Sequence, residues 1–395
     1  MARGEFFTGQ VERIAAGGAG IVRLEGKCVF IELTAPGDLI RYRIQRDHKN
    51  WAEGELLEIL EASALRISPV CSHYGRCGGC NLQHMTYEAQ LEAKTSILKE
   101  AFTRIGGITP PAIRLQKSAP FEYRNRVQFH FDTSPGFMER KSSRLVAIKD
   151  CPVADSGIRK ALKEATLRPP PGKKRFNVYS RFNTFLREGD AGKGRVSILD
   201  KELAIDAGVF FQSNAAMLEL LIVDLLAAAS EADRNLPLAD IYCGVGTFAA
   251  FLGGEYQGNR GFPVIDLVEE NKAALDLAGE NMPQGKKVNY FALSDTDWAK
   301  KQKDRSWGFM VMDPPREGLS GPFREWLARN GPEKAAYVSC DPATLARDSR
   351  VLLEGGYKLA SLNLYDFYPQ TSHVESLAVF TRAGSQAAAI TAAGG

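Results

Sequence analysis

The sequence contains no run of about 18 consecutive apolar residues, so it offers no segment long enough to cross a membrane as a helix. Its first ten residues, MARGEFFTGQ, lack the apolar core of a secretory signal. We therefore expect a cytoplasmic protein whose thiols stay reduced. Its seven cysteines are an odd number, so clustered cysteines indicate metal binding or catalysis rather than disulfides. Nothing in the sequence predicts a membrane or an obligatory protein partner.

A strong overall charge is also missing, because 50 Lys and Arg residues are balanced by 47 Asp and Glu residues. The charge is unevenly distributed, however. Residues 121–195 contain 17 basic and 8 acidic residues, a net charge of +9. A basic central segment is typical of proteins that bind a polyanion, although a solvated surface rich in lysine and arginine would have the same composition.

The chain of 395 residues is longer than one hydrophobic core usually needs, so two or three domains are expected. Five short strand-like segments separated by turn residues predict a small closed β-barrel at the N-terminus. A helical pattern over residues 86–105 follows. A second β-rich region, from residue 123 to about 207, includes one helix near residues 155–167. We predict a barrel over 1–62, a central domain over 63–207, an α/β domain over 208–383 and a flexible tail over 384–395.

Strands and helices alternate from Asn214 onward, which predicts a doubly wound α/β sheet. A helix is expected in AAMLELLIVDLLAAA. The strands expected are LADIYC, PVIDL, VNYFAL, GFMVMD, AAYVSC, KLASLNLYDFY and ESLAVFTR.

A glycine-rich loop joins the first of these strands to a helix. In DIYCGVGT, Gly244 and Gly246 let backbone N–H groups approach a ligand closely. About twenty residues later the next strand is expected to end at Asp266, a spacing that suits a carboxylate binding ribose hydroxyls. The third glycine of the dinucleotide fingerprint is missing, which disfavours NAD. The D-x-Y-C-G-x-G form resembles the S-adenosylmethionine loop of class I methyltransferases.

Reactive residue types stand at three further strand ends: Asp313, Cys340 and Glu375. Ligands of open α/β sheets bind beyond the carboxyl ends of the strands, so Asp313 and Cys340 are expected to face one crevice. In a methyltransferase sheet the seventh strand runs antiparallel beside the fifth, which would bring Glu375 to Cys340. Arg316 follows Asp-Pro-Pro where amino-methylating enzymes usually have an aromatic residue, which disfavours methylation of an exocyclic nitrogen.

A cysteine paired with a carboxylate suits methylation of a pyrimidine carbon. A thiolate that adds to C6 of uracil makes C5 nucleophilic enough to accept a methyl group. A base must then remove the C5 proton so that the thiol can leave. Cys340 would be the nucleophile and Glu375 the base. A packed core position for Cys340 and a solvated one for Glu375 remain alternatives.

The segments YVSCDPATLARD and FYPQTSHVES closely resemble those of S-adenosylmethionine-dependent RNA uracil-5-methyltransferases, and the resemblance covers nearly the whole chain. It implies a class I, Rossmann-like methyltransferase domain, an α+β central domain, and an N-terminal TRAM domain, an oligonucleotide-binding-type barrel. It also implies Cys340 as nucleophile and Glu375 as base. The family usually has glutamate where we place Asp266. The cofactor-binding positions implied are Gln212, Tyr242, Gly244, Gly246, Thr247, Asp266, Asp295 and Asp313.

Three cysteines lie within ten residues, in CSHYGRCGGC. The resemblance implies a fourth partner in Cys151, because the family branch acting on large ribosomal RNA binds a 4Fe–4S cluster with such a set. Cys71, Cys77, Cys80 and Cys151 are thus expected to ligate the cluster. Four cysteines also suit zinc, and His73 and His84 would offer substitute ligands.

The sequence therefore predicts an enzyme that converts a uridine of RNA, specifically of 23S ribosomal RNA, to 5-methyluridine. The expected partners are RNA, S-adenosylmethionine and the iron–sulfur cluster. Two alternatives remain open. One is a transfer RNA uridine methyltransferase, a branch that normally lacks both cluster and barrel. The other is a non-catalytic RNA-binding assembly factor.

Overall fold

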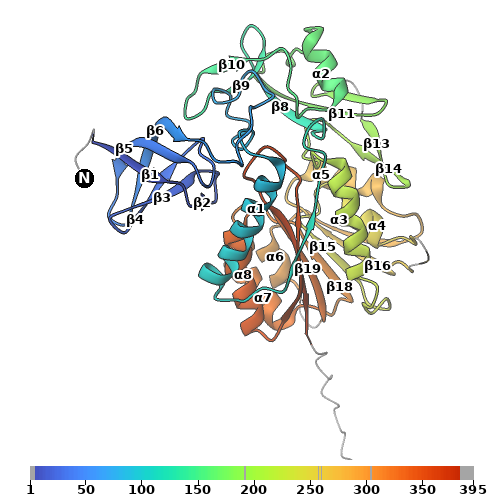
Figure 1. Cartoon of the computed structure of the whole chain (residues 1–395). Coiled ribbons are helices and arrows are strands. Elements are labelled where there is room, and N and C mark those ends of the chain that lie inside the picture. The colour runs from blue at the N-terminus through green and yellow to red at the C-terminus, as the bar shows by residue number, and fades with distance from the viewer. Residues whose placement is uncertain (1–4, 191–192, 257, 259, 303–304, 383–395) are drawn as a thin grey trace, which may run out of the picture. The chain divides into compact units, whose positions relative to one another are not determined.

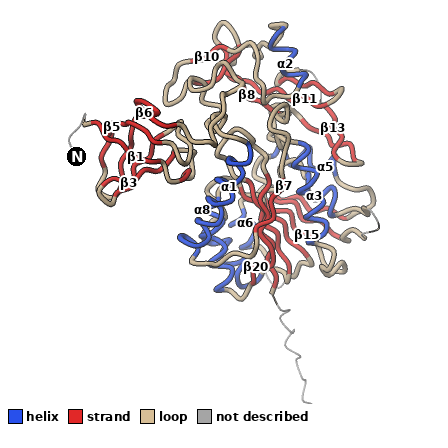
Figure 2. Tube along the Cα trace, viewed as in Figure 1, coloured by secondary structure: helices blue, strands red, loops and turns tan. Residues whose placement is uncertain are grey.

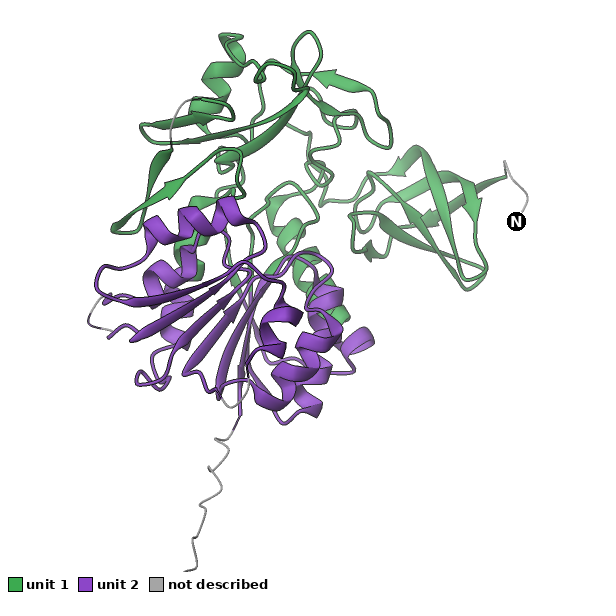
Figure 3. Ribbon diagram, turned by 180° about the vertical axis from the view of Figure 1, so that it is seen from behind, with its two compact units in different colours: residues 1–101, 115–221, 364–375 green, residues 102–114, 222–363, 376–395 purple. Residues whose placement is uncertain are grey.

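The computed structural model describes residues 5–190, 193–256, 258, 260–302 and 305–382, and the expected tail over 384–395 lies outside them (Figure 1). The chain forms two compact units. Unit 1 comprises residues 1–101, 115–221 and 364–375, and unit 2 comprises residues 102–114, 222–363 and 376–395 (Figure 3). The division of the sequence into four segments stays a prediction. Among the described residues, no helix is both long enough and apolar enough to span a bilayer.

The N-terminal part of unit 1 is a six-stranded sheet in the order β1-β5-β6-β4-β3-β2. Apolar side chains alternate with polar ones along β5, so Ile40 and Tyr42 are fully buried while Arg41 pairs with Glu58 across the outer face at 2.7 Å. The strands are β1 Phe6–Gln10, β2 Arg13–Ile14, β3 Gly20–Leu24, β4 Lys27–Ile31, β5 Leu39–Asp47 and β6 Trp51–Glu61.

The predicted helix over 86–105 is present as α1 Tyr87–Ala101, continued by a short π-helix, η1 Phe102–Gly106. The central part of unit 1 is a five-stranded sheet in the order β10-β9-β8-β11-β12, with α2 packed on it and a separate β13–β14 hairpin. Its elements are β8 Arg126–Phe131, β9 Pro135–Met138, β10 Leu145–Ala147, α2 Ser156–Lys163, β11 Arg175–Arg181, β12 Thr184–Arg187, β13 Gly194–Ile198 and β14 Lys201–Ile205.

An eight-stranded sheet in the order β17-β16-β15-β18-β19-β21-β20-β7 forms the core of unit 2. Helices cover both of its faces (Figure 2). All four residues of β15 and of β18 are buried, as expected for strands covered on both sides. The strands are β7 Ile113–Gln116, β15 Leu238–Ile241, β16 Val264–Val268, β17 Lys287–Phe291, β18 Phe309–Met312, β19 Lys334–Ser339, β20 Lys358–Tyr365 and β21 Glu375–Thr381.

The helices between these strands begin at residues that can cap them. Asn271, Ser294, Ser320 and Asp341 each accept a hydrogen bond from a backbone N–H in the first turn of the following helix. The helices are α3 Ala215–Ala228, α4 Thr247–Leu252, α5 Lys272–Asn281, α6 Asp295–Lys300, α7 Gly321–Asn330 and α8 Pro342–Glu354. All seven predicted strands are present, and β21 runs antiparallel beside β19, which confirms the doubly wound sheet.

Candidate active site

The glycine-rich loop between β15 and α4 turns sharply through residues with positive φ. Tyr242, Gly244 and Gly246 have φ values of 62°, 53° and 75°. A Cβ at Gly246 would lie 2.8 Å from the Met282 methyl group, so glycine is needed where α4 meets α5. A Cβ at Gly244 would meet nothing within 4 Å. The loop therefore presents backbone at Gly244 to open space, as a ligand-binding turn requires.

Asp240 is hydrogen-bonded to α4, the helix that follows this loop. Its side chain is fully buried, and one carboxylate oxygen accepts a hydrogen bond from Ala249 N at 3.0 Å. Burial raises the pKa of Asp240 well above its ordinary value. Cys243 is 6% exposed, and burial likewise raises the pKa of its thiol, so it packs in the loop.

The prediction that the second strand ends at Asp266 is wrong. The acid that follows this strand is Glu269. β16 continues to Val268, which leaves Asp266 in mid-strand and fully buried. Its carboxylate accepts hydrogen bonds from Asn289, Arg305 and Trp307 at 2.8–2.9 Å. Glu269 follows the strand and accepts a hydrogen bond from Gly244 N at 3.1 Å. The strand-end carboxylate thus lies directly against the glycine loop.

The structure brings Tyr242 and Asp295 together at the same edge. Tyr242 Oη donates to Asp295 Oδ2 at 2.5 Å, and Ser320 N donates to the same oxygen at 3.1 Å. Burial, reinforced by this carboxylate, raises the pKa of Tyr242. Asp295 begins α6, the helix that follows β17, so it lies toward the carboxyl end of the sheet.

Asp313 and Thr247 complete this edge of the sheet. Asp313 follows β18, and its N–H donates to Ile241 O at 3.3 Å, so it lies beside the end of β15. Thr247 opens α4 and is 8% exposed. Gln212 belongs to unit 1, where it is 8% exposed just before α3. Its role toward a cofactor stays a prediction.

Cys340 directly follows β19, and Glu375 is the first residue of β21. β19 ends at Ser339 and β21 starts at Glu375. The antiparallel register pairs Ser339 with Ser376, and Ser376 Oγ lies 3.4 Å from Ser339 O. One step further along each strand are Cys340 and Glu375. Cys340 is partly exposed and Glu375 is 4% exposed. That Cys340 and Glu375 act together stays a prediction.

Helix α8 begins two residues after Cys340 and fixes the loops around it. Thr344 Oγ donates to Arg316 O at 3.2 Å, and Arg347 donates to Glu317 O at 2.8 Å, so α8 holds the loop that follows Asp313. The partial positive charge at the N-terminus of a helix favours an anion nearby, such as a thiolate.

Asp348 on α8 is a positioning residue that sequence reasoning missed. It is fully buried and accepts hydrogen bonds from Tyr337 Oη and Leu319 N, both at 2.9 Å, and from Arg324. It lies eight residues after Cys340 within the motif YVSCDPATLARD. Only its place inside that motif distinguished it from a surface residue of a helix.

The four clustered cysteines lie together within unit 1. They line one cavity of about 240 Å³, together with Tyr74, Arg124 and Phe137 among others. Gly79 N donates to Cys77 Sγ at 3.4 Å. Burial raises the pKa of the Cys80 thiol to about 12 and that of Cys151 to about 11. Cys71, Cys77, Cys80 and Cys151 thus come together across 80 residues of chain.

The four cysteines that line the cavity are a donor set that suits either a cluster or a zinc ion. Among the described residues, no three His, Cys, Asp or Glu side chains converge closely enough to hold one metal ion. Four zinc-bound sulfurs would each lie about 2.3 Å from the metal. The two substitute ligands proposed for zinc do not line the cavity. Both ring nitrogens of His84 are already engaged, with Tyr74 Oη at 2.5 Å and Thr34 O at 3.0 Å.

The sheet order, glycine loop and strand-end acids of unit 2 define a class I, Rossmann-like methyltransferase. The pattern of the family described as tRNA (Uracil-5-)-methyltransferase matches residues 190–383. An uncharacterized RNA methyltransferase of Treponema denticola is 35% identical, over 91% of this chain and 94% of its own length. The 23S rRNA (uracil(1939)-C(5))-methyltransferase of Aeromonas hydrophila is 31% identical, over 92% of this chain and 93% of its own.

A solved structure has the same fold. The tRNA (uracil-54, C5)-methyltransferase of Pyrococcus abyssi, in complex with S-adenosyl-L-homocysteine, superposes with a TM-score of 0.71 at 22% identity, over 95% of this chain and 100% of that one. The chain belongs to the S-adenosylmethionine-dependent RNA uracil-C5 methyltransferase family.

Proposed function

We propose that this protein methylates C5 of a uridine in 23S ribosomal RNA, with Cys340 as nucleophile and Glu375 as base. The observation that supports the chemistry is the β19–β21 register, which pairs Ser339 with Ser376, each next in the chain to one of the two proposed catalytic residues. Support for the ribosomal substrate comes from relatives named 23S rRNA (uracil(1939)-C(5))-methyltransferase, at 30–31% identity over at least 92% of this chain.

The reaction has three steps, which are addition, methyl transfer and elimination. The Cys340 thiolate adds to C6 of the uracil, and the electron pair of the C5=C6 bond makes C5 nucleophilic. S-adenosylmethionine supplies an electrophilic methyl group to that carbon. Glu375 then takes the proton from C5, the C5=C6 bond reforms, and the Cys340 thiolate leaves. A positioned base of this kind contributes about 10²–10⁴ in rate.

Glu269 replaces Asp266 as the carboxylate that binds the ribose of the methyl donor. It lies at the strand end against Gly244, where a ribose diol would approach, and its length agrees with the glutamate usual in the family. Tyr242, Asp295 and Asp313 share this edge of the sheet and form the remaining wall of the site in unit 2.

RNA would bind the central part of unit 1, where arginines lie over exposed aromatic rings. Arg181 lies 4.9 Å from the ring centre of Phe182, which is 82% exposed, and Arg126 lies 5.6 Å from that of Phe210, which is 59% exposed. Exposed rings of this kind stack on unpaired bases, and the arginines neutralise phosphates. The N-terminal six-stranded sheet would be the family's TRAM domain.

The cysteine cavity would hold a 4Fe–4S cluster through Cys71, Cys77, Cys80 and Cys151. The donor set fits, because four thiolates are the usual ligands of this cluster, and the volume far exceeds what one ion occupies. Arg124 also lines the cavity and would offset the negative charge of the thiolates. Transfer of a methyl group needs no electron, so the cluster would have a structural role.

The proposed activity is tested by transfer of a labelled methyl group from S-adenosylmethionine to unmodified 23S ribosomal RNA and to transfer RNA in parallel. We expect label in ribosomal RNA as 5-methyluridine, and none with the Cys340→Ala variant. Label in transfer RNA alone would replace the ribosomal substrate by the alternative one. Full activity of Cys340→Ala would contradict the covalent mechanism, and no label in either RNA would favour a non-catalytic RNA-binding protein.

A further inference from the structure

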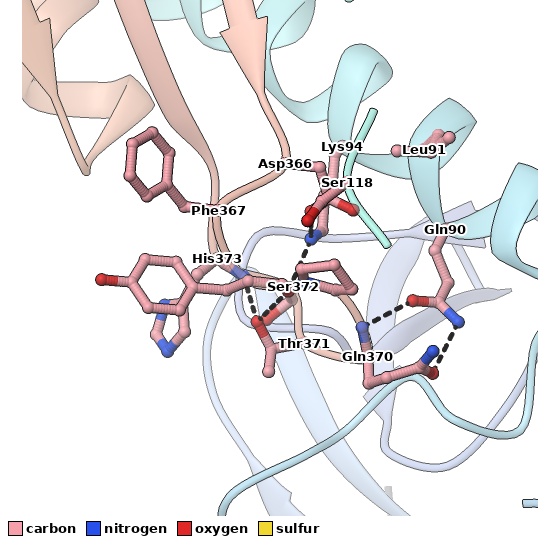
Figure 4. Close-up of polar contacts among 12 residues, drawn as sticks. Gln90, Leu91, Lys94, Ser118, Asp366, Phe367, Gln370, Thr371, Ser372 and His373 are labelled. Carbon is pink, nitrogen blue, oxygen red and sulfur yellow. Dashed lines mark hydrogen bonds and ion pairs between the residues drawn. The ribbon is translucent and has the colours of Figure 1, made fainter. Parts of the chain in front are cut away.

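The loop between β20 and β21, residues 366–374, leads directly into Glu375. Figure 4 shows it lying against α1, which contributes Gln90 and Lys94. The loop has no regular secondary structure for most of its length, yet Asp366, Gln370 and Thr371 are at most 4% exposed. A buried irregular backbone must find hydrogen-bond partners outside helix and strand ladders.

Four successive carbonyl groups of this loop, from Phe367 to Gln370, all have such partners within unit 1. Each accepts a hydrogen bond from a residue distant in the sequence. The donors, in order, are Asn214 Nδ2 at 3.1 Å, Lys94 Nζ at 2.9 Å, Tyr123 Oη at 2.9 Å, and the backbone N–H groups of Asn81 and Leu82 at 3.1 and 3.0 Å. The loop is therefore held by side-chain and backbone groups from several elements, in addition to its own turn hydrogen bonds.

Gln90 holds the loop where its backbone is least favourable. Gln370 has a φ of 69°, in the left-handed region that costs a non-glycine residue free energy. Its N–H donates to Gln90 Oε1 at 2.9 Å, and Gln90 Nε2 donates back to Gln370 Oε1 at 3.0 Å (Figure 4). Gln90 is fully buried, so these two hydrogen bonds are not shared with solvent.

Asn81 makes a second pair of bonds, two residues further along the loop. Ser372 N donates to Asn81 Oδ1 at 2.9 Å, and Asn81 Nδ2 lies 3.0 Å from Ser372 Oγ. Asn81 directly follows Cys80, one of the four cysteines that line the cavity. The cysteine-bearing loop and the segment that ends at Glu375 are thus joined by side-chain and backbone hydrogen bonds.

We propose that Asn81 and Gln90 are positioning residues that hold residues 370–374 so that Glu375 can take the proton from C5 of the methylated uracil. Through Asn81, the cysteine-bearing loop then sets the orientation of the base, which gives the cluster a role in the elimination step. This inference rests on the covalent mechanism proposed above. Neither residue is expected to contact RNA or methyl donor.

The proposal makes a selective prediction, because addition and methyl transfer depend on Cys340 while elimination depends on Glu375. When the carboxylate is misplaced, the C5 proton stays, the Sγ–C6 bond does not break, and the methylated RNA remains covalently attached to the protein. A general loss of structure would instead slow the earlier steps equally, and no adduct would accumulate.

The test uses full-length protein, ordinary unmodified ribosomal RNA and S-adenosylmethionine with a labelled methyl group. The SDS-resistant protein–RNA adduct and the free 5-methyluridine product are measured in a single turnover. For Asn81→Ala and Gln90→Ala we expect labelled adduct to accumulate and its release to slow about tenfold or more, whereas its formation changes by less than about threefold. Asn81→Asp keeps the acceptor for Ser372 N and should largely restore release.

Thr95→Ala is the matched control, because Thr95 lies on α1 and its hydroxyl donates within the helix, to Leu91 O at 2.9 Å. It should release product at the wild-type rate. Visible absorbance and thermal unfolding of each variant report loss of the cluster or of the fold. If Asn81→Ala does not fold, Gln90→Ala carries the test. Equal slowing of formation and release in the folded variants would overturn the proposal.

Glu375→Gln distinguishes the two levels of inference. If this variant accumulates adduct and the Asn81 and Gln90 variants do not, the positioning proposal fails and the covalent mechanism stands. If Glu375→Gln releases product normally, the assignment of the base itself is wrong, and the positioning proposal falls with it.

Discussion

Asp266 lies within β16 and Glu269 directly follows it, so the two carboxylates meet different surroundings. Only Leu267 and Val268 lie between them, so the end of β16 decides which of them reaches the ligand edge. Apolar residues continue to Val268, and both Val268 and Leu267 are buried. The sequence-based prediction ended the strand at the first acid, whereas the buried hydrogen bonds of Asp266 allow the strand to continue past it.

The two acids are expected to respond differently to removal of their charge. Glu269→Gln should raise the KM for S-adenosylmethionine by about tenfold or more, because a hydrogen bond to a charged group is worth about 1.5–3 kcal/mol, and should leave unfolding unchanged. Asp266→Asn should lower the free energy of unfolding by about 1–3 kcal/mol with little change in KM. Steady-state kinetics and denaturant unfolding separate these outcomes. The reverse pattern would restore Asp266 as the ligand-binding acid.

His84 predicts a loss of stability in mild acid. Burial lowers its pKa from 6.5 to about 4. An imidazole that stays neutral in the folded protein but gains a proton when unfolded stabilises the fold fully above about pH 6.5. That contribution declines as the pH falls toward 4, by up to about 3 kcal/mol. Denaturant unfolding between pH 4 and 7 should show this slope, and His84→Asn should reduce it. An equal slope in the variant would contradict the assignment.

At the scale of elements, α1 is attached to the β20–β21 loop by a buried ion pair. Lys94 and Asp366 are both fully buried, and their atoms approach to 2.5 Å. Tyr87 Oη also donates to Asp366, at 2.8 Å. Burial lowers the pKa of Lys94, while the carboxylate opposes this effect. The pair lies one helical turn from Gln90, so it supports the same loop.

Breaking this pair should cost far more than breaking an exposed one. Lys94→Met leaves an uncompensated buried carboxylate and is expected to lower the free energy of unfolding by about 3–5 kcal/mol. The double variant Lys94→Met with Asp366→Leu should recover part of that loss. Arg41→Met, which removes a pair whose side chains are half exposed, should cost less than about 1 kcal/mol. Chemical denaturation measures all three, and equal losses for both single variants would contradict this ranking.

The sequence pattern predicted the long periodic elements and missed those that depend on distant partners. The predicted strands of unit 2 are all present because each is a compact apolar run between turn residues. Strand β7 was not predicted, since its four residues follow a proline-rich turn and form a strand only by joining the edge of the sheet. The first of the five expected N-terminal strand segments, residues 9–15, is split between β1 and β2.

At the scale of the whole molecule, sites are assembled from segments far apart in the chain. Spacing alone identified the cluster of Cys71, Cys77 and Cys80, whereas Cys151 came only from the family resemblance. The structure brings all four to one cavity. The expected pairing of Cys340 with Glu375 likewise depended on knowing the sheet order of methyltransferases. The hydrogen bonds of Asn81 and Gln90 to the β20–β21 loop could not be predicted, since amides have many alternative partners.

The cysteine cavity gives a prediction for the whole chain. Protein purified without oxygen should be brown and contain about four irons per chain. Cys151→Ser should lose this absorbance and about 2–5 kcal/mol of stability, a loss comparable to that of a native cross-link. Cys28→Ser, which alters a cysteine of β4 outside the cavity, should change neither. Iron analysis and thermal unfolding test this, and colourless protein with one bound zinc would contradict the cluster.

The bond between Cys340 and the pyrimidine ring is tested most directly by RNA that carries 5-fluorouridine. Fluorine at C5 cannot be removed as a cation by a base, so elimination stops after methyl transfer and the sulfur–carbon bond persists. Peptide mass analysis should then find the modified nucleotide on Cys340, in wild-type protein and not in Cys340→Ala. Methylation of ordinary RNA by a protein that forms no such adduct would contradict covalent catalysis by this residue.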